Sequence, residues 1–345
     1  MAKKSAARQK MPTMYDVARL AGVSQPTVSR VLNDNNTSVQ ISDETRQRVM
    51  AAIEELGYRP NILARSLRTQ RTQTIALMIA DLSNAFYHPV ARAVQDMAHQ
   101  RKFEVLIFNS DHLHENEIHF CEVVSRRPVD GVLMSPYHLT PEDIDKYFSP
   151  SQTPVAVLGP HVNHPLVDVI YVDDERASYE AICWMIAERG YRDFGFLGVT
   201  DNLRPGARRF RGFLRALDES GITFDERFLV KGDFTLESGV DAARQYLALE
   251  RLPRAIYAIN DLMAIGLVLT LQESGVRIPD DVAVLGFDDI PEARIVRPML
   301  TTIAQDPREM GRSLVTALFE RMDSVEELPR RIIEAKSHLV VRDSA

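Results

Sequence analysis

Cysteine is scarce in this chain of 345 residues, which contains only Cys121 and Cys183. Two cysteines, each in an apolar segment of helical character, exclude a disulfide framework and a cysteine-based metal site as organising features. Long hydrophobic runs are also missing, because no stretch reaches the 18 consecutive apolar residues typical of a membrane span. The basic segment 1–10 is followed by no apolar core or cleavage site of a secretory signal. These absences predict a cytoplasmic protein.

Motifs of common enzymes are missing as well. The chain has no glycine-rich dinucleotide or P-loop pattern and no G-x-S-x-G elbow. In the histidine-rich segment 112–119, His114 and His119 are five positions apart, not the four that place two imidazoles on one helix face. This segment is more typical of a solvated loop leading into a helix. Aspartate pairs at 173–174 and 288–289 could act as acid and base, but polar ligand contacts are as natural after a strand. The sequence therefore predicts neither an enzyme nor a metal or cofactor site.

Charge is unevenly distributed along the chain. The formal net charge is −7, yet residues 1–71 hold 12 basic against 6 acidic side chains, a net of +6, which leaves −13 for the rest. Clustered cations favour a polyanion partner, because counterions are released when cations meet phosphates. Charge alone leaves a merely solvated basic surface as an equal alternative.

The basic N-terminal part has the pattern of three short helices. Thr13 is the expected N-cap of the first helix, and Gly22 ends it. Ser24 can cap the second helix, with Pro26 in the first turn, where a missing N–H does no harm. A third helix is expected after Ser42. Two helices joined by a tight glycine-bearing turn, with a supporting helix behind them, predict a helix-turn-helix unit.

The remainder of the chain alternates between short apolar strands and longer amphipathic helices. The predicted strands are 75–80, 105–109, 131–135, 155–158, 169–172, 194–197, 228–230, 256–259 and 282–287. The predicted helices are 90–100, 179–189, 209–220, 239–249 and 262–274. Apolar strands separated by helices imply parallel sheets that are covered on both faces. The number of strand–helix units is larger than one open sheet comfortably holds, which predicts two doubly wound subdomains.

Several segments closely resemble the LacI/GalR family of bacterial transcriptional regulators. The headpiece carries the resemblance in YDVARLAGVSQPTVSRVLN at 15–33, TRQRV at 45–49 and LGYRPN at 56–61. The body carries it in IYAINDLMAIG at 256–266, VLGFDD at 284–289 and LTTI at 300–303. The resemblance covers nearly the whole chain after residue 12. It implies an all-α headpiece with a hinge helix, followed by an α/β body of two parallel-sheet subdomains like type I periplasmic binding proteins.

The resemblance also implies how the chain is divided. The expected parts are a basic, disordered tail at 1–11, a DNA-binding domain at 12–59 with its motif at 14–33, a hinge helix or linker at 60–71, an N-terminal effector-binding subdomain at 72–172 and 304–331, and a C-terminal effector-binding subdomain at 173–303 and 332–345. The chain shows no C-terminal leucine heptad of the kind that makes tetramers, so a homodimer is expected.

The second helix of the headpiece has the side chains of a recognition helix, whose N-terminal residues meet base edges in the major groove. Glutamine can bond adenine with both a donor and an acceptor, and arginine can bond two guanine acceptors. Proline offers only apolar contact. The resemblance implies base contacts for Gln25, Pro26 and Arg30, and phosphate contacts for Thr27, Ser29 and Asn33. The alternative is a helix-turn-helix unit that contacts protein.

The segment after the headpiece is a short, marginal helix or an ordinary linker when its residues are taken alone. The resemblance implies a hinge helix that contacts DNA through Asn61, Ala64 and Leu67. Leu67 falls at the position of the leucine that enters the minor groove, where apolar wedges kink DNA.

The resemblance places a small effector between the two body subdomains. The effector-binding positions that it implies are Phe86, Arg209, Phe234, Asn260, Asp288 and Gln305. Arginine can donate parallel hydrogen bonds to hydroxyls or a carboxylate, and phenylalanine can pack against a sugar ring. Asn260 could instead cap the helix that follows it, and Phe86 could belong to the core.

These observations predict a DNA-binding transcription regulator, in the first place a repressor. It would act as a homodimer on a pseudo-palindromic operator, under the control of a sugar-like effector, away from membranes. The alternative is a cytoplasmic sugar-binding protein or an enzyme built on the same body.

Overall fold

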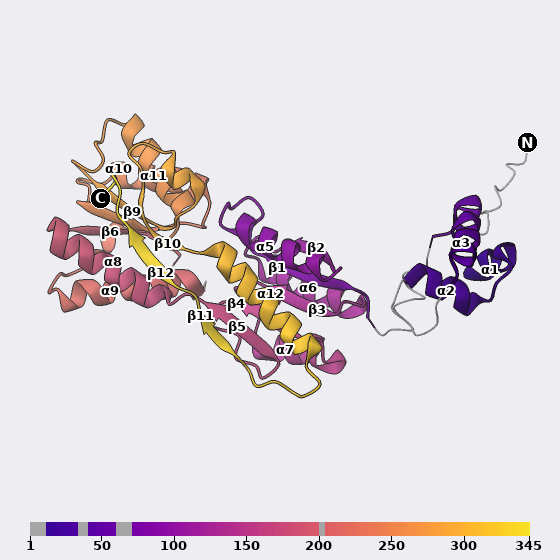
Figure 1. The fold of residues 1–345 in the computed structure, drawn as a ribbon. Helices are drawn as coiled ribbons and strands as arrows, with labels where there is room; N and C mark the ends of the chain where they lie inside the picture. Colours follow the sequence, from indigo (N-terminus) through magenta and orange to yellow (C-terminus); the bar gives the residue numbers. More distant parts are fainter. Residues whose placement is uncertain (1–11, 34–40, 60–70, 200–203) are drawn as a thin grey trace, which may run out of the picture. The chain divides into compact units, whose positions relative to one another are not determined.

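The computed structural model forms two units, one ending at Thr72 and one beginning at Gln73 (Figure 1). It describes residues 12–33, 41–59, 71–199 and 204–345. The predicted tail at 1–11 lies outside the described residues. So do residues 60–70 of the predicted hinge, with Asn61, Ala64 and Leu67.

The first unit is a helix-turn-helix followed by a supporting helix, as predicted. Its helices are α1 (Met14–Ala21), α2 (Gln25–Asn33) and α3 (Asp43–Leu56). Thr13 caps α1 in a reciprocal capping box with Asp16, and Gly22 ends it in the left-handed conformation. Ser42 caps α3. The small core that joins the three helices is formed by Val17, Ala18, Ala21, Val28, Val31, Val49, Ala52 and Tyr58.

The second unit contains two six-stranded sheets, each belonging to one subdomain. The N-terminal subdomain orders its strands β11-β5-β4-β3-β1-β2, all parallel. The C-terminal subdomain orders them β12-β10-β9-β8-β6-β7, with only β12 antiparallel. In chain order the strands are β1 (Thr74–Ile79), β2 (Glu104–Asn109), β3 (Gly131–Met134), β4 (Val155–Leu158), β5 (Val167–Tyr171), β6 (Phe194–Gly198), β7 (Leu229–Lys231), β8 (Ala255–Ala258), β9 (Ala283–Asp288), β10 (Thr301–Gln305), β11 (Ile332–Glu334) and β12 (Ser337–Val340).

Helices cover both faces of each sheet (Figure 1). The N-terminal subdomain has α5 (Tyr87–Gln100) and α12 (Pro307–Asp323) on one face, and α6 (His114–Arg126) and α7 (Pro141–Tyr147) on the other. The C-terminal subdomain pairs α8 (Asp174–Arg189) with α9 (Arg204–Glu219), and α10 (Leu236–Leu247) with α11 (Asp261–Glu273). The last pair packs very closely, since a Cβ atom at Gly266 would lie 2.2 Å from the Leu236 carbonyl oxygen.

The nine predicted strands are present, with ends that differ by at most two residues. The sequence pattern missed β10, β11 and β12, and it missed the helices α7 and α12. The two short strands β11 and β12 lack the continuous apolar run that identified the others, and their residues are all exposed or half-buried. The predicted loop at 112–119 is shorter than expected, since α6 already begins at His114.

The two sheets also differ from the expected subdomain limits at two places. Ile332–Glu334 pairs with β5, which puts β11 in the N-terminal subdomain instead of the C-terminal one. Thr301–Gln305 completes the C-terminal sheet, so the chain crosses back only after Gln305. The chain passes between the subdomains after β5, after β10 and between β11 and β12. Parallel strands end at the same edge of a sheet, which directs the loops of both subdomains toward a shared cleft.

Candidate functional site

The helix α2 turns its predicted base-reading residues toward solvent. Gln25, Pro26 and Arg30 are exposed, while Val28 and Val31 on the opposite side are buried in the core of the first unit. Thr27 and Ser29 are half-buried. This division follows from helical spacing, which places the apolar positions on one face. The side chain of Asn33 is outside what the structure describes.

The beginning of α2 is held by Ser24. The Ser24 hydroxyl accepts the backbone N–H of Thr27 at 3.3 Å and also lies 2.9 Å from the Thr27 hydroxyl. An N-terminal cap of this kind satisfies a backbone donor that the helix itself leaves free. This cap therefore stabilises the end of α2 that carries Gln25 and Pro26.

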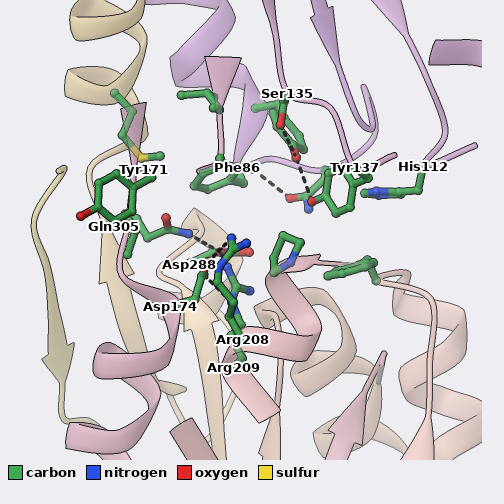
Figure 2. A pocket seen from close by; sticks show the side chains of 18 residues that line it. Phe86, His112, Ser135, Tyr137, Tyr171, Asp174, Arg208, Arg209, Asp288 and Gln305 are labelled. Carbon is green, nitrogen blue, oxygen red and sulfur yellow. Dashed lines mark hydrogen bonds and ion pairs between the residues drawn. The ribbon is translucent and has the colours of Figure 1, made fainter. Parts of the chain in front are cut away.

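A cleft with about 610 Å³ of space between protein atoms, part of it open to solvent, separates the two subdomains (Figure 2). The residues that line it are Asn84, Phe86, Tyr87, His112, Ser135, Tyr137, Leu158, Gly159, Tyr171, Val172, Asp174, Pro205, Arg208, Arg209, Phe234, Asp288, Gln305 and Met310. Five of the six predicted effector positions are among them, and Asn260 is not.

The C-terminal side of the cleft carries a charged cluster formed by Asp174, Arg208 and Arg209. One carboxylate oxygen of Asp174 accepts the Nε–H (2.9 Å) and Nη2–H (2.6 Å) of Arg208, and the other accepts the Nε–H of Arg209 at 2.9 Å. The Arg209 guanidinium also donates to the carbonyl oxygen of Ile259 and lies 3.5 Å above the ring centre of Phe287. These contacts hold the two arginines in one geometry, which suits them to hydrogen-bond a polar molecule in the cleft.

Asp288 and Gln305 extend this cluster at the ends of β9 and β10. The Gln305 amide donates to Asp288 Oδ1 at 2.7 Å, and Arg209 Nη2 lies 3.9 Å from the same oxygen. Burial raises the pKa of Asp288 to about 7, although Arg209 and Gln305 act to lower it. Asp288 thus titrates near neutral pH. Its backbone has φ of +119°, an unusual conformation for a residue with a side chain.

The N-terminal side of the cleft is mostly aromatic. Phe86 and Tyr87 lie edge to face with ring centres 5.1 Å apart. The Tyr87 hydroxyl lies 3.4 Å from the Ser135 hydroxyl and 3.3 Å from that of Tyr137. Figure 2 shows the rings of Phe86 and Tyr137 facing the charged cluster across the cleft. An aromatic wall opposite hydrogen-bonding groups fits a ligand that has one apolar face and a polar edge.

Glu117 fixes the position of Tyr137. This carboxylate is fully buried on α6 and accepts the backbone N–H groups of Tyr137 at 2.6 Å and of His138 and Leu139 at 3.0 Å. Burial raises the pKa of Glu117, while these three hydrogen bonds act to lower it. The loop after β3 is therefore held by one side chain of the neighbouring helix.

Asn260 caps α11, which is the alternative that the sequence leaves open beside a contact with the effector. Its amide oxygen accepts the Met263 N–H at 3.0 Å, and its amide nitrogen donates to the carbonyl oxygen of Phe234 at 2.8 Å. Asn260 thus lies behind the cleft and orients Phe234, which lines it. A direct contact of Asn260 with an effector remains a prediction.

In each of the two aspartate pairs, one member lines the cleft and the other makes a structural contact. Asp173 caps α8 by accepting the Arg176 N–H at 3.0 Å, and Asp174 belongs to the charged cluster. Asp289 accepts from Arg294 at 2.6 Å and from Arg342.

Five further cleft residues were not among the six predicted effector positions, although Asp174 was considered as a polar ligand contact: His112, Ser135, Tyr137, Asp174 and Arg208. All five follow a strand closely or neighbour a predicted position, so the rule that ligands meet the carboxyl ends of parallel strands could have selected them. The exact position of Tyr137 also depends on Glu117, which accepts its backbone N–H.

Across the described ranges of the chain, no group of three or more His, Cys, Asp or Glu side chains is arranged to hold a metal ion. Within the same ranges, no helix is both long enough and apolar enough to cross a membrane.

The fold and the cleft define a protein of two parts, a helix-turn-helix unit and a body of the ligand-binding type. The pattern described as "Bacterial regulatory proteins, lacI family" matches residues 13–61, and that described as "Periplasmic binding protein-like domain" matches residues 185–345. The HTH-type transcriptional repressor PurR of Photobacterium profundum is 33% identical over 334 residues, which are 97% of this chain and 98% of that protein. The chain belongs to the lacI family of bacterial regulatory proteins.

Solved structures of relatives have the same architecture. The structure titled transcriptional regulator CelR-cellobiose complex is 30% identical, with a TM-score of 0.71, and covers 97% of this chain and 100% of that one. The structure of the lac repressor dimer bound to operator and the anti-inducer ONPF is 26% identical, with a TM-score of 0.81, and covers 97% and 99%. These likenesses confirm the predicted fold class, a helix-turn-helix headpiece followed by two parallel-sheet α/β subdomains.

Proposed function

We propose that this protein is a sequence-specific DNA-binding repressor whose operator affinity is controlled by a small polar effector bound in the cleft. The observation that supports the proposal most directly is α2, which exposes Gln25, Pro26 and Arg30 on a helix whose other face is buried. Exposed polar side chains at the start of a helix-turn-helix recognition helix can reach base edges in the major groove. The net charge of +6 in residues 1–71 favours the same partner.

A sugar or a sugar derivative is the effector class that best fits the cleft. Arg208, Arg209 and Gln305 offer fixed hydrogen-bond donors, and Asp174 and Asp288 offer acceptors. Hydroxyl groups can bond both kinds of partner, and the aromatic rings opposite can pack against the C–H face of a sugar ring. The relative that was solved with cellobiose supports this class.

The repressor acts as a homodimer on a pseudo-palindromic operator. Two copies related by twofold symmetry present two recognition helices to two half-sites. The relative solved as a dimer on its operator supports this arrangement. In each copy, Asn61, Ala64 and Leu67 of the hinge contact the minor groove, and Thr27, Ser29 and Asn33 contact phosphates.

The effector acts on DNA through the difference in its affinity for two arrangements of the subdomains. By thermodynamic linkage, effector and operator change each other's affinity by the same factor. The hinge is the element that responds, because a short helix is marginal alone and depends on its neighbours for order.

The experiment begins with two unbiased screens of the purified full-length protein. Selection from random DNA duplexes identifies a preferred operator, and thermal shift with sugars, sugar acids, polyols and nucleosides identifies a ligand that stabilises the fold. Operator affinity is then measured with and without the selected compound. We expect a preferred half-site in inverted repeat and a change in affinity on adding the compound. No sequence preference would refute the proposal, and turnover of the compound would favour the enzyme alternative.

Two arginines of α9 provide the test variant and its control. Arg209→Ala should abolish the effector response, because Arg209 is 6% exposed and lines the cleft. Arg211→Ala should respond like the wild type, since the exposed Arg211 pairs with Glu175 and does not line the cleft. If the compound is an inducer, Arg209→Ala keeps its effector-free operator affinity; if it is a co-repressor, tight operator binding is lost. A full wild-type response in Arg209→Ala would exclude Arg209 as a necessary contact.

A further inference from the structure

His112 and Phe234 make a contact between the two subdomains at one end of the cleft. His112 comes from the loop between β2 and α6, and Phe234 from the loop between β7 and α10. Their rings are stacked, with centres 5.0 Å apart and planes at 19°. Tyr137 meets both rings edge-on, at 4.6 Å from His112 and 5.9 Å from Phe234 (Figure 2). The subdomains therefore touch here through aromatic side chains.

Both stacked residues have an unusual backbone conformation. The φ angles are +56° at His112 and +74° at Phe234, in the left-handed region that large side chains rarely adopt. Each carbonyl group is held by a neighbouring side chain: the His138 ring nitrogen Nε2 donates to His112 O at 2.8 Å, and Asn260 donates to Phe234 O at 2.8 Å. Backbone strain persists where surrounding contacts enforce it, and it often marks a functional position.

The imidazole of His112 has unsatisfied polar atoms. Neither ring nitrogen has a hydrogen-bond partner within the described part of the chain, and both are buried from solvent. Burial lowers the pKa of His112, against the opposing effect of Asp81, Asp111 and Asp233, so the ring is neutral. A neutral imidazole carries one N–H donor and one acceptor, and burying both unpaired costs free energy comparable to lost hydrogen bonds.

The free-energy cost of leaving the two His112 nitrogens unpaired depends on the distance between the subdomains. When the subdomains move apart, water can bond both nitrogens, whereas in the arrangement described here no described residue bonds either of them. The stacked rings alone favour contact between the subdomains, and the unpaired nitrogens oppose it. A ligand in the cleft that supplies an acceptor and a donor would bond both His112 nitrogens and remove this free-energy cost.

We propose that His112 contacts the effector directly and makes the approach of the two subdomains depend on it. This inference rests on the proposed function in so far as the cleft binds an effector. The ligand must offer both an acceptor and a donor close to the His112–Phe234 stack, and a pair of adjacent hydroxyl groups does so. His112 then discriminates polyhydroxylated ligands from apolar molecules of the same size, which would leave both nitrogens unpaired.

Two substitutions separate the polar atoms of His112 from its ring. His112→Phe keeps a ring that can stack on Phe234 and removes both nitrogens. His112→Asn removes the stack, keeps a donor and an acceptor, and suits the left-handed backbone. His119→Phe is the control, because His119 lies on the helix that follows the loop and does not line the cleft.

X-ray scattering of the full-length proteins without added ligand gives the first test. His112→Phe should be more compact than the wild type, because removing the two unpaired buried nitrogens shifts the ratio of closed to open subdomains by at least about tenfold. His119→Phe should scatter like the wild type. Identical scattering of His112→Phe and the wild type would overturn the proposal, whatever any ligand does.

Calorimetric titration with ribose and with cellobiose gives the second test. For whichever sugar binds the wild type, His112→Phe should bind at least about tenfold more weakly, as expected for a lost hydrogen bond in a buried site, and His112→Asn should retain more of the affinity. Equal affinities of wild type and His112→Phe would overturn the proposal. If neither sugar binds the wild type, the scattering comparison alone decides the role of His112, and the effector class is decided by the screen described under the proposed function.

Discussion

Two adjacent aspartates at the end of β9 should respond to the same substitution with opposite signs. Asp288 faces the cleft, and burial raises its pKa to about 7 from an ordinary value of 3.8. Asp289 accepts from Arg294 and Arg342; burial acts to raise its pKa, but the two arginines outweigh burial and lower it. Asparagine has nearly the shape of aspartate and tolerates the positive φ at both positions. Asp288→Asn and Asp289→Asn thus remove a charge with little change in packing.

The sign for Asp288 follows from linkage between protonation and folding. Because its pKa is higher in the folded protein than in the unfolded chain, folding favours the protonated form, and stability falls as the pH rises from about 4 to about 7. A difference of about three pH units, at 1.36 kcal/mol for each, amounts to about 4 kcal/mol at pH 8. The amide in Asp288→Asn does not ionise, and its oxygen can still accept from Gln305. We therefore expect Asp288→Asn to gain stability over the wild type as the pH rises, by about 3 kcal/mol between pH 5 and pH 8.

The sign for Asp289 is the reverse. Its pKa is lowered in the folded protein, so its contribution to stability is present above the unfolded pKa and is lost as the pH falls. Arg342 carries most of the effect, because the Arg294 side chain is 64% exposed and its pair is screened by solvent. Asp289→Asn should lose about 1.5–3 kcal/mol at neutral pH, the usual contribution of a hydrogen bond between charged groups.

Urea-induced unfolding of the full chain at pH 5 and pH 8, followed by circular dichroism, measures both differences. The single tryptophan, Trp184 on α8, reports on the C-terminal subdomain in the same samples. The comparison between pH values is independent of any constant effect of the substitution on packing. A stability gap between Asp288→Asn and wild type that is the same at both pH values would refute the reasoning. So would a loss of stability in Asp288→Asn that increases with pH.

Three further predictions concern other parts of the chain. Arg30→Ala should cost about 1–3 kcal/mol of operator binding with little effect on random DNA, measured by fluorescence anisotropy; equal losses on both would indicate a phosphate contact instead. Asp168→Asn should cost about 3–5 kcal/mol of stability, because this fully buried carboxylate pairs with two arginines and each would lose that ion pair; a loss below about 1 kcal/mol in urea unfolding would contradict this. Gly266→Ala should cost about 1–3 kcal/mol, since its new methyl group would collide with the Leu236 carbonyl, and an unchanged thermal midpoint would show that α10 and α11 can separate freely.

The helix-turn-helix unit could be predicted almost completely from the sequence, because its determinants are local. The caps at Thr13 and Ser42 and the turn at Gly22 depend on residues within a few positions of one another. The spacing of Val28 and Val31 decides which face of α2 is buried, and thereby which face is exposed. The same holds for seven of the nine predicted strands, which are buried along nearly their whole length and therefore need apolar side chains on both faces, whereas β2 and β7 are more exposed.

The exchange of elements between the subdomains could not be predicted in this way. The strand β11 is short, half-exposed and joins β5, whose Tyr171 is 163 positions before its partner Glu334. Its position is determined by the free edge of the N-terminal sheet and by Asp168, which accepts the Arg331 backbone N–H at 2.9 Å. Nothing within the local sequence distinguishes it from a loop, because its stability comes from a remote partner.

The cleft residues, too, could be predicted only in part, because some depend on the local sequence and others on contacts between remote segments. The sequence placed Asn260 and Asp288 after strands, but it could not tell which side chain would turn into the cleft and which would turn back to cap a helix. The structure brings Asp288 to Arg209 and Gln305, and it uses Asn260 to hold the Phe234 carbonyl. His112 meets Phe234 only because two loops remote from each other in the sequence end at facing edges of two sheets. Residue type sets what a side chain can bond, whereas the packing of remote elements decides which of those bonds is made.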